Sequence, residues 1–387
     1  MIIISEVVHN GEVHFQVNSC FVSMISILCP NEKILVRAEE NHIIALRKNL
    51  RKDNLENVEF LSFDKYYDAK KYNWGSRIFG EFIQISKTLL KGRALNNKIY
   101  IWTCLFPTGH FFLNLITYFQ KNKKHIIILH GELEYLKNKN KTKAENIFGR
   151  ILKAGMNLST NKNKYIVLGD NIKNNLYGLV SNRILKKTFS ILHPYNFTIQ
   201  EKLQEIKDDN KLIIGAIGTQ MLSKNSQCIY KLAKRFEVSI MRDEIIFRTI
   251  GKVLPELDSY KSDLVENLYS STFVSQEQFE IEISKLSFVI FFYDDTAYEL
   301  CASGAIFEVI RMGIPIISIE NDFFRWLFNT FGEMGFLCKD IDSLEEILKG
   351  LKQGSFKNEI DVFKNNISHF KIQNDLKNIA LNMKPLL

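Results

Sequence analysis

The sequence predicts an α/β protein that contains two doubly wound parallel sheets. Three observations predict this fold class: a length of 387 residues, an alternation of short β-branched runs with longer helical patterns, and a polar break near the middle. A chain of this length is too long for one ordinary hydrophobic core. About half of the residues are apolar and a quarter are charged, as in a soluble globular protein.

Seven strands are expected in the first half and five in the second, with helical patterns between them. The expected strands are Met1–Ser5, Lys33–Arg37, Val58–Phe63, Lys98–Thr103, His125–Leu129, Lys164–Leu168, Phe189–Leu192, Lys211–Ile217, Glu244–Thr249, Ser271–Val274, Ser287–Tyr293 and Ile314–Ile319. The charged stretch Asn196–Asn210 interrupts the alternation. We therefore expect one Rossmann-like domain over 1–200, a second over 201–370, and a C-terminal helix over 371–387 that crosses back to the first domain.

The charge is unevenly distributed along the chain. Residues 1–200 contain 29 Lys and Arg against 15 Asp and Glu (+14), and the remaining 187 residues contain 22 against 28 (−6), which gives the net +8. Segment 73–95 adds aromatic residues to this basic half. A basic half with an amphipathic helix fits peripheral contact with an anionic membrane or an anionic lipid carrier. The alternative is an ordinary solvated face.

The sequence predicts a cytoplasmic location, with contact at the inner face of the membrane. The N-terminus has no basic region before its apolar run, and no apolar run reaches the ~18 residues that a membrane span needs. The six cysteines form no CxxC pair and lie at no zinc-ligand spacing, which fits small core residues in a reducing compartment.

Residues 303–317, SGAIFEVIRMGIPII, form the most informative motif. Ser303 is a candidate N-cap, and Gly304 lets a ligand approach the first N–H groups of the helix, which favour an anion such as a pyrophosphate. A helical wheel places Glu308 one turn further along on the open face, where its carboxylate can accept hydrogen bonds from a ribose diol. An ion pair with Arg311 is the alternative for Glu308. Gly313 and Pro315 end the helix.

Two further motifs follow strands. In IIGAIGTQMLSKN (213–225), Gly218 and Thr219 open a loop, and Lys224 is placed to neutralise a departing phosphate. In IIILHGELEYL (126–136), His130 stands at the carboxyl end of a strand, as a candidate general base or as a buried histidine satisfied by the backbone. The loop His9–Gly11 opens at the same edge. The pair Asp294–Asp295 is interpreted as solvated loop acids, with no metal role.

The order of these motifs resembles GT-B glycosyltransferases of the family-4-like group, most specifically over residues 210–320. The resemblance rests on Gly218 to Lys224, Gly251, and Glu308 followed by Gly-Ile-Pro-Ile-Ile; Leu300 stands where the first acid of the E-x7-E element is expected. It implies two Rossmann-like domains that face a cleft, with an acceptor-binding first domain and a nucleotide-sugar-binding second domain. It implies catalytic roles for His130, Lys224 and Glu308. Donor contacts are implied for Gly218, Thr219, Lys224, Ser303, Gly304, Ala305 and Glu308, and acceptor contacts for His9, Asn10, Gly11 and Glu132.

The resemblance implies transfer of a sugar from a nucleotide-diphosphate sugar, with UDP as the first choice of nucleotide. The acceptor would be a surface polysaccharide, as in capsule or O-antigen synthesis, or a lipid-linked saccharide. No cofactor or metal is expected beyond the donor itself. One alternative is a nucleotide-sugar epimerase of the same fold. A non-catalytic or nucleic-acid-binding protein is the other, although no nucleic-acid-binding motif is visible.

Overall fold

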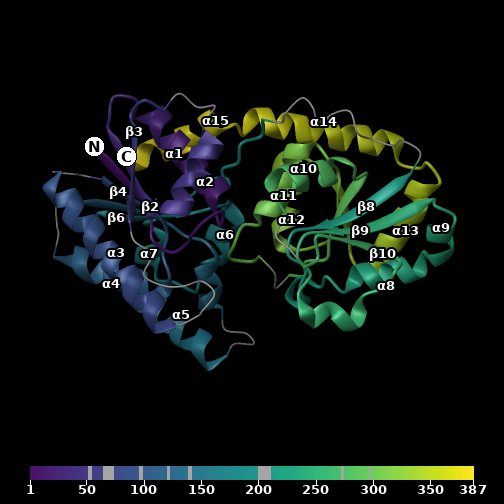
Figure 1. The fold of residues 1–387 in the computed structure, drawn as a ribbon, viewed down its shortest axis with the longest axis horizontal. Coiled ribbons are helices and arrows are strands. Elements are labelled where there is room, and N and C mark those ends of the chain that lie inside the picture. Colours follow the sequence, from purple (N-terminus) through teal and green to yellow (C-terminus); the bar gives the residue numbers. More distant parts are fainter. Residues whose placement is uncertain are drawn as a thin grey trace. The chain divides into compact units, whose positions relative to one another are not determined.

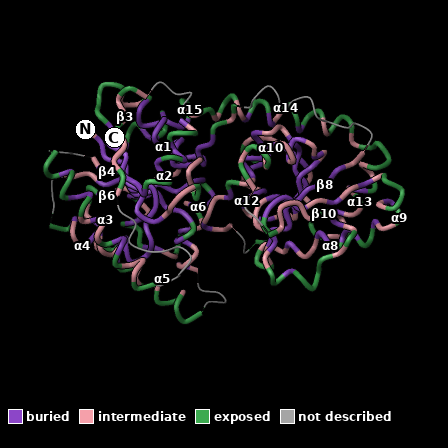
Figure 2. The backbone as a smooth tube through the Cα atoms, in the orientation of Figure 1, coloured by how far each residue is buried: buried purple, intermediate pink, exposed green. Residues whose placement is uncertain are grey.

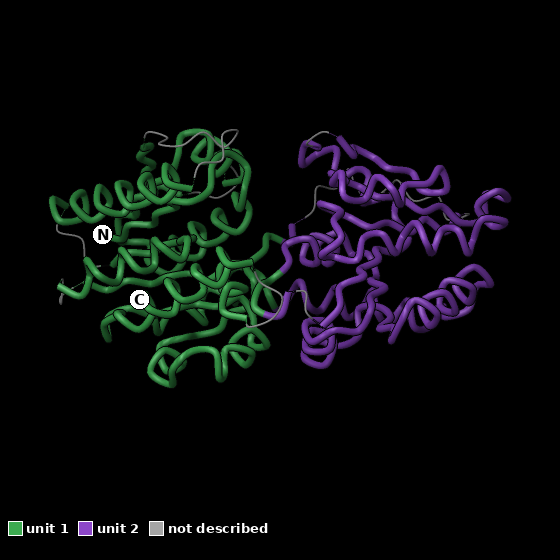
Figure 3. The backbone as a smooth tube through the Cα atoms, turned by 90° about the horizontal axis from the view of Figure 1, so that it is seen from below, with its two compact units in different colours: residues 1–196, 300–302, 374–387 green, residues 197–299, 303–373 purple. Residues whose placement is uncertain are grey.

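The computed structural model describes residues 1–50, 55–63, 74–95, 99–119, 123–137, 142–198, 211–271, 274–295 and 298–387. These residues form two compact units (Figure 3). Unit 1 comprises residues 1–196, 300–302 and 374–387, and unit 2 comprises residues 197–299 and 303–373. The expected boundary at residue 200 and the expected strand start at Lys98 lie outside the described residues.

Unit 1 contains a seven-stranded sheet in the order β3-β2-β1-β4-β5-β6-β7, in which all neighbouring strands are parallel. Its strands are β1 (Ile2–Glu6), β2 (Ile34–Glu39), β3 (Val58–Phe63), β4 (Ile99–Cys104), β5 (Lys124–Ile128), β6 (Asn163–Val167) and β7 (Thr188–Ser190). The central strands β1, β4 and β5 are almost continuously buried, as expected for a parallel sheet covered on both faces (Figure 2).

Helices cover both faces of this sheet (Figure 1). One group contains α1 (Phe15–Leu28), α2 (Glu40–Leu50) and α15 (Leu376–Met383), which pack on one another, and the other contains α3 (Trp74–Ala94), α4 (Pro107–Tyr118) and α5 (Lys143–Leu158). The shorter elements are η1 (Gly131–Leu136), α6 (Asp170–Asn175), α7 (Asn182–Leu185) and the terminal η5 (Lys384–Leu386). Helices α4 and α5 approach each other closely at Gly155, where an added Cβ would lie only 2.7 Å from the Phe111 nitrogen.

Unit 2 contains a six-stranded parallel sheet in the order β10-β9-β8-β11-β12-β13. Its strands are β8 (Leu212–Ile217), β9 (Ile245–Ile250), β10 (Val265–Leu268), β11 (Phe288–Phe291), β12 (Ile316–Ile319) and β13 (Gly335–Cys338). Its helical elements are η3 (Leu222–Lys224), α8 (Cys228–Arg235), α9 (Glu237–Met241), η4 (Pro255–Tyr260), α10 (Gln276–Ser284), α11 (Gly304–Met312), α12 (Asp322–Phe331), α13 (Ile341–Lys352) and α14 (Lys357–Gln373). The predicted fold class of two parallel α/β sheets is confirmed.

Both edges of the second sheet differ from the sequence prediction. The strand predicted at Ser271–Val274 lies partly outside the described residues, because 272–273 are not described; Ser271 and Val274 lie in no strand, and β10 lies at Val265–Leu268. β13 was not predicted at all. Edge strands are short and polar on one side, here with Glu266 and Asn267 within β10, so they lack the continuous apolar run of a central strand.

Candidate functional site

Each sheet has a switch point at which the chain leaves neighbouring strands in opposite directions. In unit 1 it lies between β1 and β4, and in unit 2 between β8 and β11. Ligands of doubly wound proteins bind beyond the carboxyl ends of the strands at such points. The predicted loops His9–Gly11 and Gly218–Lys224 directly follow β1 and β8, so the structure brings these sequence-predicted residues to the two switch points.

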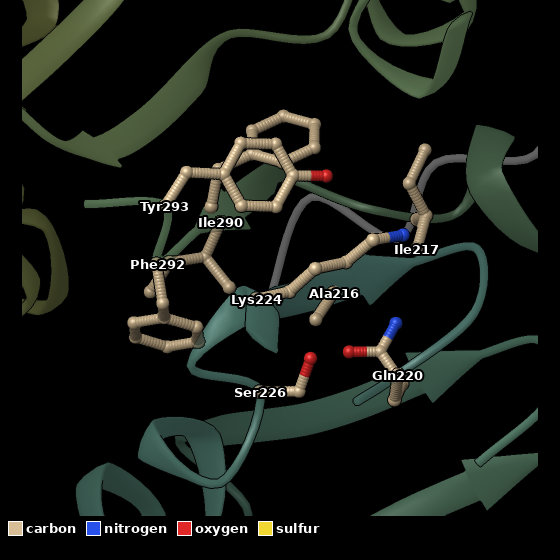
Figure 4. Close-up of a pocket in the computed structure, with 9 residues that line it drawn as sticks. Ala216, Ile217, Gln220, Lys224, Ser226, Ile290, Phe292 and Tyr293 are labelled. Carbon is tan, nitrogen blue, oxygen red and sulfur yellow. The ribbon is translucent and has the colours of Figure 1, made fainter. Parts of the chain in front are cut away.

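A pocket lies at the switch point of unit 2 (Figure 4). The ends of β8 and β11 form its floor, and the loop after β8 supplies its polar groups. The lining residues are Ala216, Ile217, Gln220, Lys224, Ser226, Ile290, Phe291, Phe292 and Tyr293. Figure 4 shows the Lys224 side chain extended across the pocket, with Tyr293 on one side of it and Gln220 and Ser226 on the other. The pocket therefore combines an apolar floor with one cationic group.

Lys224 is held in place by its own loop. Its Nζ donates to the carbonyl oxygen of Thr219 at 3.1 Å and lies 6.0 Å from the ring centroid of Tyr298. Asn225 follows in the left-handed conformation (φ 54°) and ends η3, and its side chain donates to the carbonyl oxygen of Phe292. These contacts hold the ammonium group beside the carboxyl end of β11, where a cationic group suits an anionic ligand.

Two glycines make this loop possible. Gly218 has φ +80°, and Gly251, after β9, has φ +122°. A Cβ on Gly251 would lie 2.7 Å from the carbonyl oxygen of Gly218, so a side chain there would push the two backbones apart. A Cβ on Gly218 itself would meet open space. Gly251 is thus required for packing, whereas Gly218 presents bare backbone to the surroundings.

Tyr293 is a pocket residue that the sequence analysis did not single out. It is buried, and burial raises its pKa to about 12 against the opposing effect of hydrogen bonds with Ser303 and Tyr298. Its hydroxyl therefore stays protonated at neutral pH and can donate as well as accept. The signal in the sequence was a hydroxyl directly after the apolar run of β11. Gln220, which donates to the carbonyl oxygen of Gly218 at 3.0 Å, also went unnoticed.

The start of α11 is exposed, as the motif at 303–317 predicted. Ser303 occupies the N-cap position but makes no capping hydrogen bond. Gly304 is exposed, and a Cβ there would meet no atom within 4 Å. The helix ends at Gly313 with φ +71°, which confirms the predicted C-terminus. Gly304 and Ala305 thus begin a helix whose side-chain cap is missing, a favourable place for an anion.

The prediction that Glu308 lies on the open face is wrong. Its side chain is buried, with 3% of its surface exposed, and forms an ion pair with Arg311. Arg311 also pairs with Glu280 of α10 at 2.7 Å, and its carbonyl oxygen accepts from Lys371 of α14. A helical wheel cannot show that neighbouring helices cover this turn while leaving the first turn open. The structure therefore realises the alternative ion pair, and a ribose role for Glu308 remains a prediction.

The acids after β11 are engaged in structural contacts. Asp295 pairs with Arg325 at 2.8 Å, and Asp294 accepts from Asn225 at 3.2 Å. Across the described ranges, no group of three or more His, Cys, Asp or Glu side chains is arranged to hold a metal ion. Leu300, at the position of the expected first acid, is buried in the core of unit 1, and its N–H donates to Glu134.

Glu6 organises the switch point of unit 1. One carboxylate oxygen accepts from the N–H groups of Val8 and His9, at 2.8 and 2.9 Å. The other accepts from Asn18 and from Thr103 at the end of β4, at 3.0 and 2.9 Å. Sequence reasoning missed this residue, although an acid that ends an apolar strand is a recognisable signal. Glu6 therefore fixes the loop after β1 against β4.

The tip of that loop is also tied down. Gly11 donates its N–H to Glu39 at 3.2 Å, and its carbonyl oxygen accepts from His42 Nδ1 at 2.7 Å. Asn10 accepts a weak backbone bond from Val13 at 3.4 Å. These contacts give the loop a structural explanation, so its predicted acceptor role stays a prediction.

Imidazole rings gather at this switch point. The ring of His14 lies 4.1 Å from that of His9 and 4.9 Å from that of His130, between centroids. His14 adopts the left-handed conformation (φ 60°) that non-glycine residues rarely take, which is common at functional sites. Burial, followed by the neighbouring His130, lowers the pKa of His9 and of His193 to about 3. With pKa values this low, the side chains of His9 and His193 are neutral at pH 7.

His130 is buried and bonded on one side. Its Nε2 lies 2.8 Å from the carbonyl oxygen of Thr103, which can only accept, so Nε2 donates this hydrogen bond and Nδ1 is the ring nitrogen outside it. Glu132 is buried, accepts from the His130 N–H at 3.0 Å and lies 3.3 Å from His110 Nε2. The predicted alternative of a backbone-satisfied histidine is thus true of one nitrogen only.

No protein-family model and no curated protein matches the chain. Solved structures do match over its whole length. One match is S. aureus TarM in complex with UDP, α-GlcNAc-glycerol and fondaparinux. The alignment covers 100% of this chain and 99% of the TarM chain, with a TM-score of 0.65 and 10% identity. A glycosyltransferase from Rickettsia africae covers 100% over 97%, with a TM-score of 0.58 and 13% identity.

A third match is an epimerase. UDP-GlcNAc 2-epimerase from Neisseria meningitidis, bound to UDP-GlcNAc, covers 98% of this chain over 98% of its own, with a TM-score of 0.56 and 13% identity. Identities this low establish architecture and leave activity open. The two parallel sheets, their order and these full-length matches agree: the chain has the GT-B fold.

Proposed function

We propose that the protein is a glycosyltransferase that moves a sugar from a nucleotide-diphosphate sugar, with UDP-sugars first, to a saccharide acceptor. The acceptor would be a surface polysaccharide or a lipid-linked saccharide. The observation that carries the proposal is the switch-point pocket of unit 2, where Lys224 crosses an apolar floor in the same unit as the uncapped start of α11. The solved GT-B structures with bound UDP or UDP-GlcNAc support the choice of nucleotide.

The chemistry assigned to unit 2 is stabilisation of the leaving group. When the bond between the anomeric carbon and the phosphate oxygen breaks, negative charge builds on the diphosphate. The Lys224 ammonium and the N–H groups of Gly304 and Ala305 are proposed to stabilise that charge, which needs no proton transfer from the protein. The Tyr293 hydroxyl, protonated at neutral pH, is a candidate hydrogen-bond donor in the same pocket.

The chemistry assigned to unit 1 concerns hydroxyl groups. A new bond forms between an acceptor hydroxyl oxygen and the anomeric carbon, and the hydroxyl proton must leave. Because Nε2 of His130 donates to Thr103, Nδ1 is the nitrogen proposed to accept a hydrogen bond from the acceptor hydroxyl and then to take its proton. His9, Asn10, Gly11 and Glu132 are retained as proposed neighbours of the acceptor, and Glu308 as a proposed partner of the ribose.

The test is nucleotide release and sugar transfer with a panel of UDP-, GDP- and ADP-sugars. The matched variants are Lys224→Ala and Lys252→Ala, since Lys252 is an exposed lysine in the next loop of the same sheet edge. We expect Lys224→Ala to lower kcat by on the order of 100-fold and Lys252→Ala to leave it unchanged. Thermal-shift measurements with UDP separate lost binding from lost turnover.

Two outcomes would overturn the proposal. Equal turnover in both lysine variants would remove Lys224 from the reaction. An epimerised sugar that accumulates without any acceptor would identify an epimerase, the alternative that the N. meningitidis match keeps open. The pH dependence of turnover in His130→Ala, compared with His193→Ala, then tests the role given to His130.

A further inference from the structure

The surface of α3, α4 and α5 in unit 1 displays large apolar side chains to water. Phe79 and Leu90 of α3 are 62% and 63% exposed, and Phe119, at the end of α4, is 77% exposed. The other exposed members are Trp74, Phe82, Leu95, Leu115, Tyr118 and Ile147. Every exposed Phe and Trp among the described residues belongs to this set. Single exposed apolar residues are ordinary, but such a concentration marks an interaction surface.

These residues share a surface because the three helices pack side by side (Figure 1). Phe82 of α3 and Phe112 of α4 contact each other edge to face, with ring centroids 5.1 Å apart. Phe79, Phe82 and Leu90 fall on one stripe of α3, because Phe82 and Leu90 lie three and eleven positions after Phe79. We name this surface the α3–α5 face.

The exposed charges of the α3–α5 face are all positive. Its exposed charged side chains are basic: Lys87, Lys91, Arg93, Lys143, Arg150 and Lys153. The three helices contain only two acids, and neither opposes these charges strongly. Glu81 is buried and accepts from the Phe106 N–H at the start of α4, and Glu145 is bound in the capping box of α5 with Thr142. A partner of this face must therefore be apolar and anionic at once.

We propose that the α3–α5 face docks on an anionic lipid surface, with its aromatic and aliphatic side chains in the headgroup region and its lysines and arginines on lipid phosphates. A second copy of the chain fits poorly, because the same face would bring basic groups against basic groups. None of the described helices is long and apolar enough to cross a bilayer, so contact would be peripheral. The inference stands without the proposed activity.

The experiment is flotation of the full-length protein with vesicles of phosphatidylcholine, with and without phosphatidylglycerol. Binding should need the anionic lipid and weaken with salt, because exposed charges are screened. Phe79→Ser with Phe119→Ser removes apolar contacts, and Lys91→Glu with Arg93→Glu reverses charge. Each pair should weaken binding by on the order of tenfold or more. Far-UV circular dichroism checks that the variants are folded.

Matched controls lie on unit 2. Met241→Ser with Val362→Ser removes apolar side chains that are 75% and 51% exposed, and Lys357→Glu with Lys364→Glu reverses exposed charges of α14. Both should bind vesicles like the unaltered protein. The proposal is overturned if the α3–α5 variants bind as well as the controls, if no vesicle is bound, or if the face instead mediates dimer formation or RNA binding at physiological salt.

Discussion

The two units share a scaffold and differ in the groups at their switch points. In unit 1, side chains build the site: Glu6 anchors the loop, and His9, His14 and His130 stand ring to ring. In unit 2, backbone builds it: Gly218 and Gly304 expose bare main chain, and Lys224 supplies the charge. Unit 1 contains seven of the eight histidines of the chain, and unit 2 contains only His369. The same fold thus gathers imidazole side chains at one switch point, and bare backbone with a cationic side chain at the other.

Acid should unfold unit 1 before unit 2, and this difference in acid stability is the largest that we expect between the units. Burial lowers the pKa of His9, His125 and His193 to about 3, from 6.5 in the unfolded chain. Between pH 6.5 and 3 the unfolded chain binds more protons than the folded one, so the stability of unit 1 falls as pH falls through this range. Hydrogen exchange followed by mass spectrometry should show β1 and β5 opening at a pH where β8 and β11 remain protected.

Glu81 narrows the pH range over which unit 1 loses stability. Burial raises its pKa to about 8 from 4.5, so the folded unit gains relative stability as pH falls from 8 to 4.5. This opposes the histidines above pH 4.5 and adds nothing below it, which places the steepest loss between about pH 4.5 and 3. A Glu81→Gln variant should lose stability earlier on acidification. Simultaneous opening of both units would contradict the assignment of acid sensitivity to the buried histidines.

Arg311 holds the buried ion pairs of unit 2, so its substitution should strongly lower the stability of that unit. Arg311→Ala leaves the buried carboxylates of Glu308 and Glu280 without their shared cation, which should cost about 3–5 kcal/mol of unfolding free energy. Arg325→Ala is the control, because that arginine is 40% exposed and its pair with Asp295 is worth less than about 1 kcal/mol. Urea unfolding gives both values. Similar losses would mean that burial of the Arg311 pair has little energetic effect.

Gly251→Ala tests the backbone-built site of unit 2. A side chain there combines an unfavourable φ with a contact of 2.7 Å to the Gly218 oxygen, so we expect a loss of about 1–3 kcal/mol. Gly11→Ala in unit 1 is the matched control: its φ is +56°, and a Cβ would meet nothing within 4 Å. That variant should lose about 1 kcal/mol, from strain alone. Thermal denaturation compares the two, and equal losses would show that the Gly251–Gly218 approach can relax freely.

In unit 2 the sequence predicts the central strands better than the edge strands. Strands buried on both faces, such as β1 and β8, carry uninterrupted apolar runs and were located within one or two residues. The edge strand β10 carries no such run, and the four-residue run of β13 is too short to stand out. Glu308 shows the same limit for a site: its place on the helix follows from periodicity, but its burial depends on α10 and α14, which meet it only in three dimensions. His14 likewise became visible only when folding placed it beside His130.

Gly304→Ala should have the smallest effect on stability and a selective effect on binding. The added methyl group meets no atom within 4 Å, and alanine is a better helix former than glycine, so unfolding free energy should change by less than about 1 kcal/mol. The methyl group nevertheless occupies the exposed start of α11, where the donor diphosphate is proposed to approach the backbone. UDP affinity, measured by calorimetry, should therefore fall while the thermal midpoint stays constant. Gly354→Ala, at a positive φ in open space far along unit 2, should do the reverse: it lowers stability by about 1 kcal/mol and leaves UDP affinity unchanged. Unchanged UDP affinity in Gly304→Ala would remove the start of α11 from the donor site and leave Lys224 as its only anion-binding group argued from geometry.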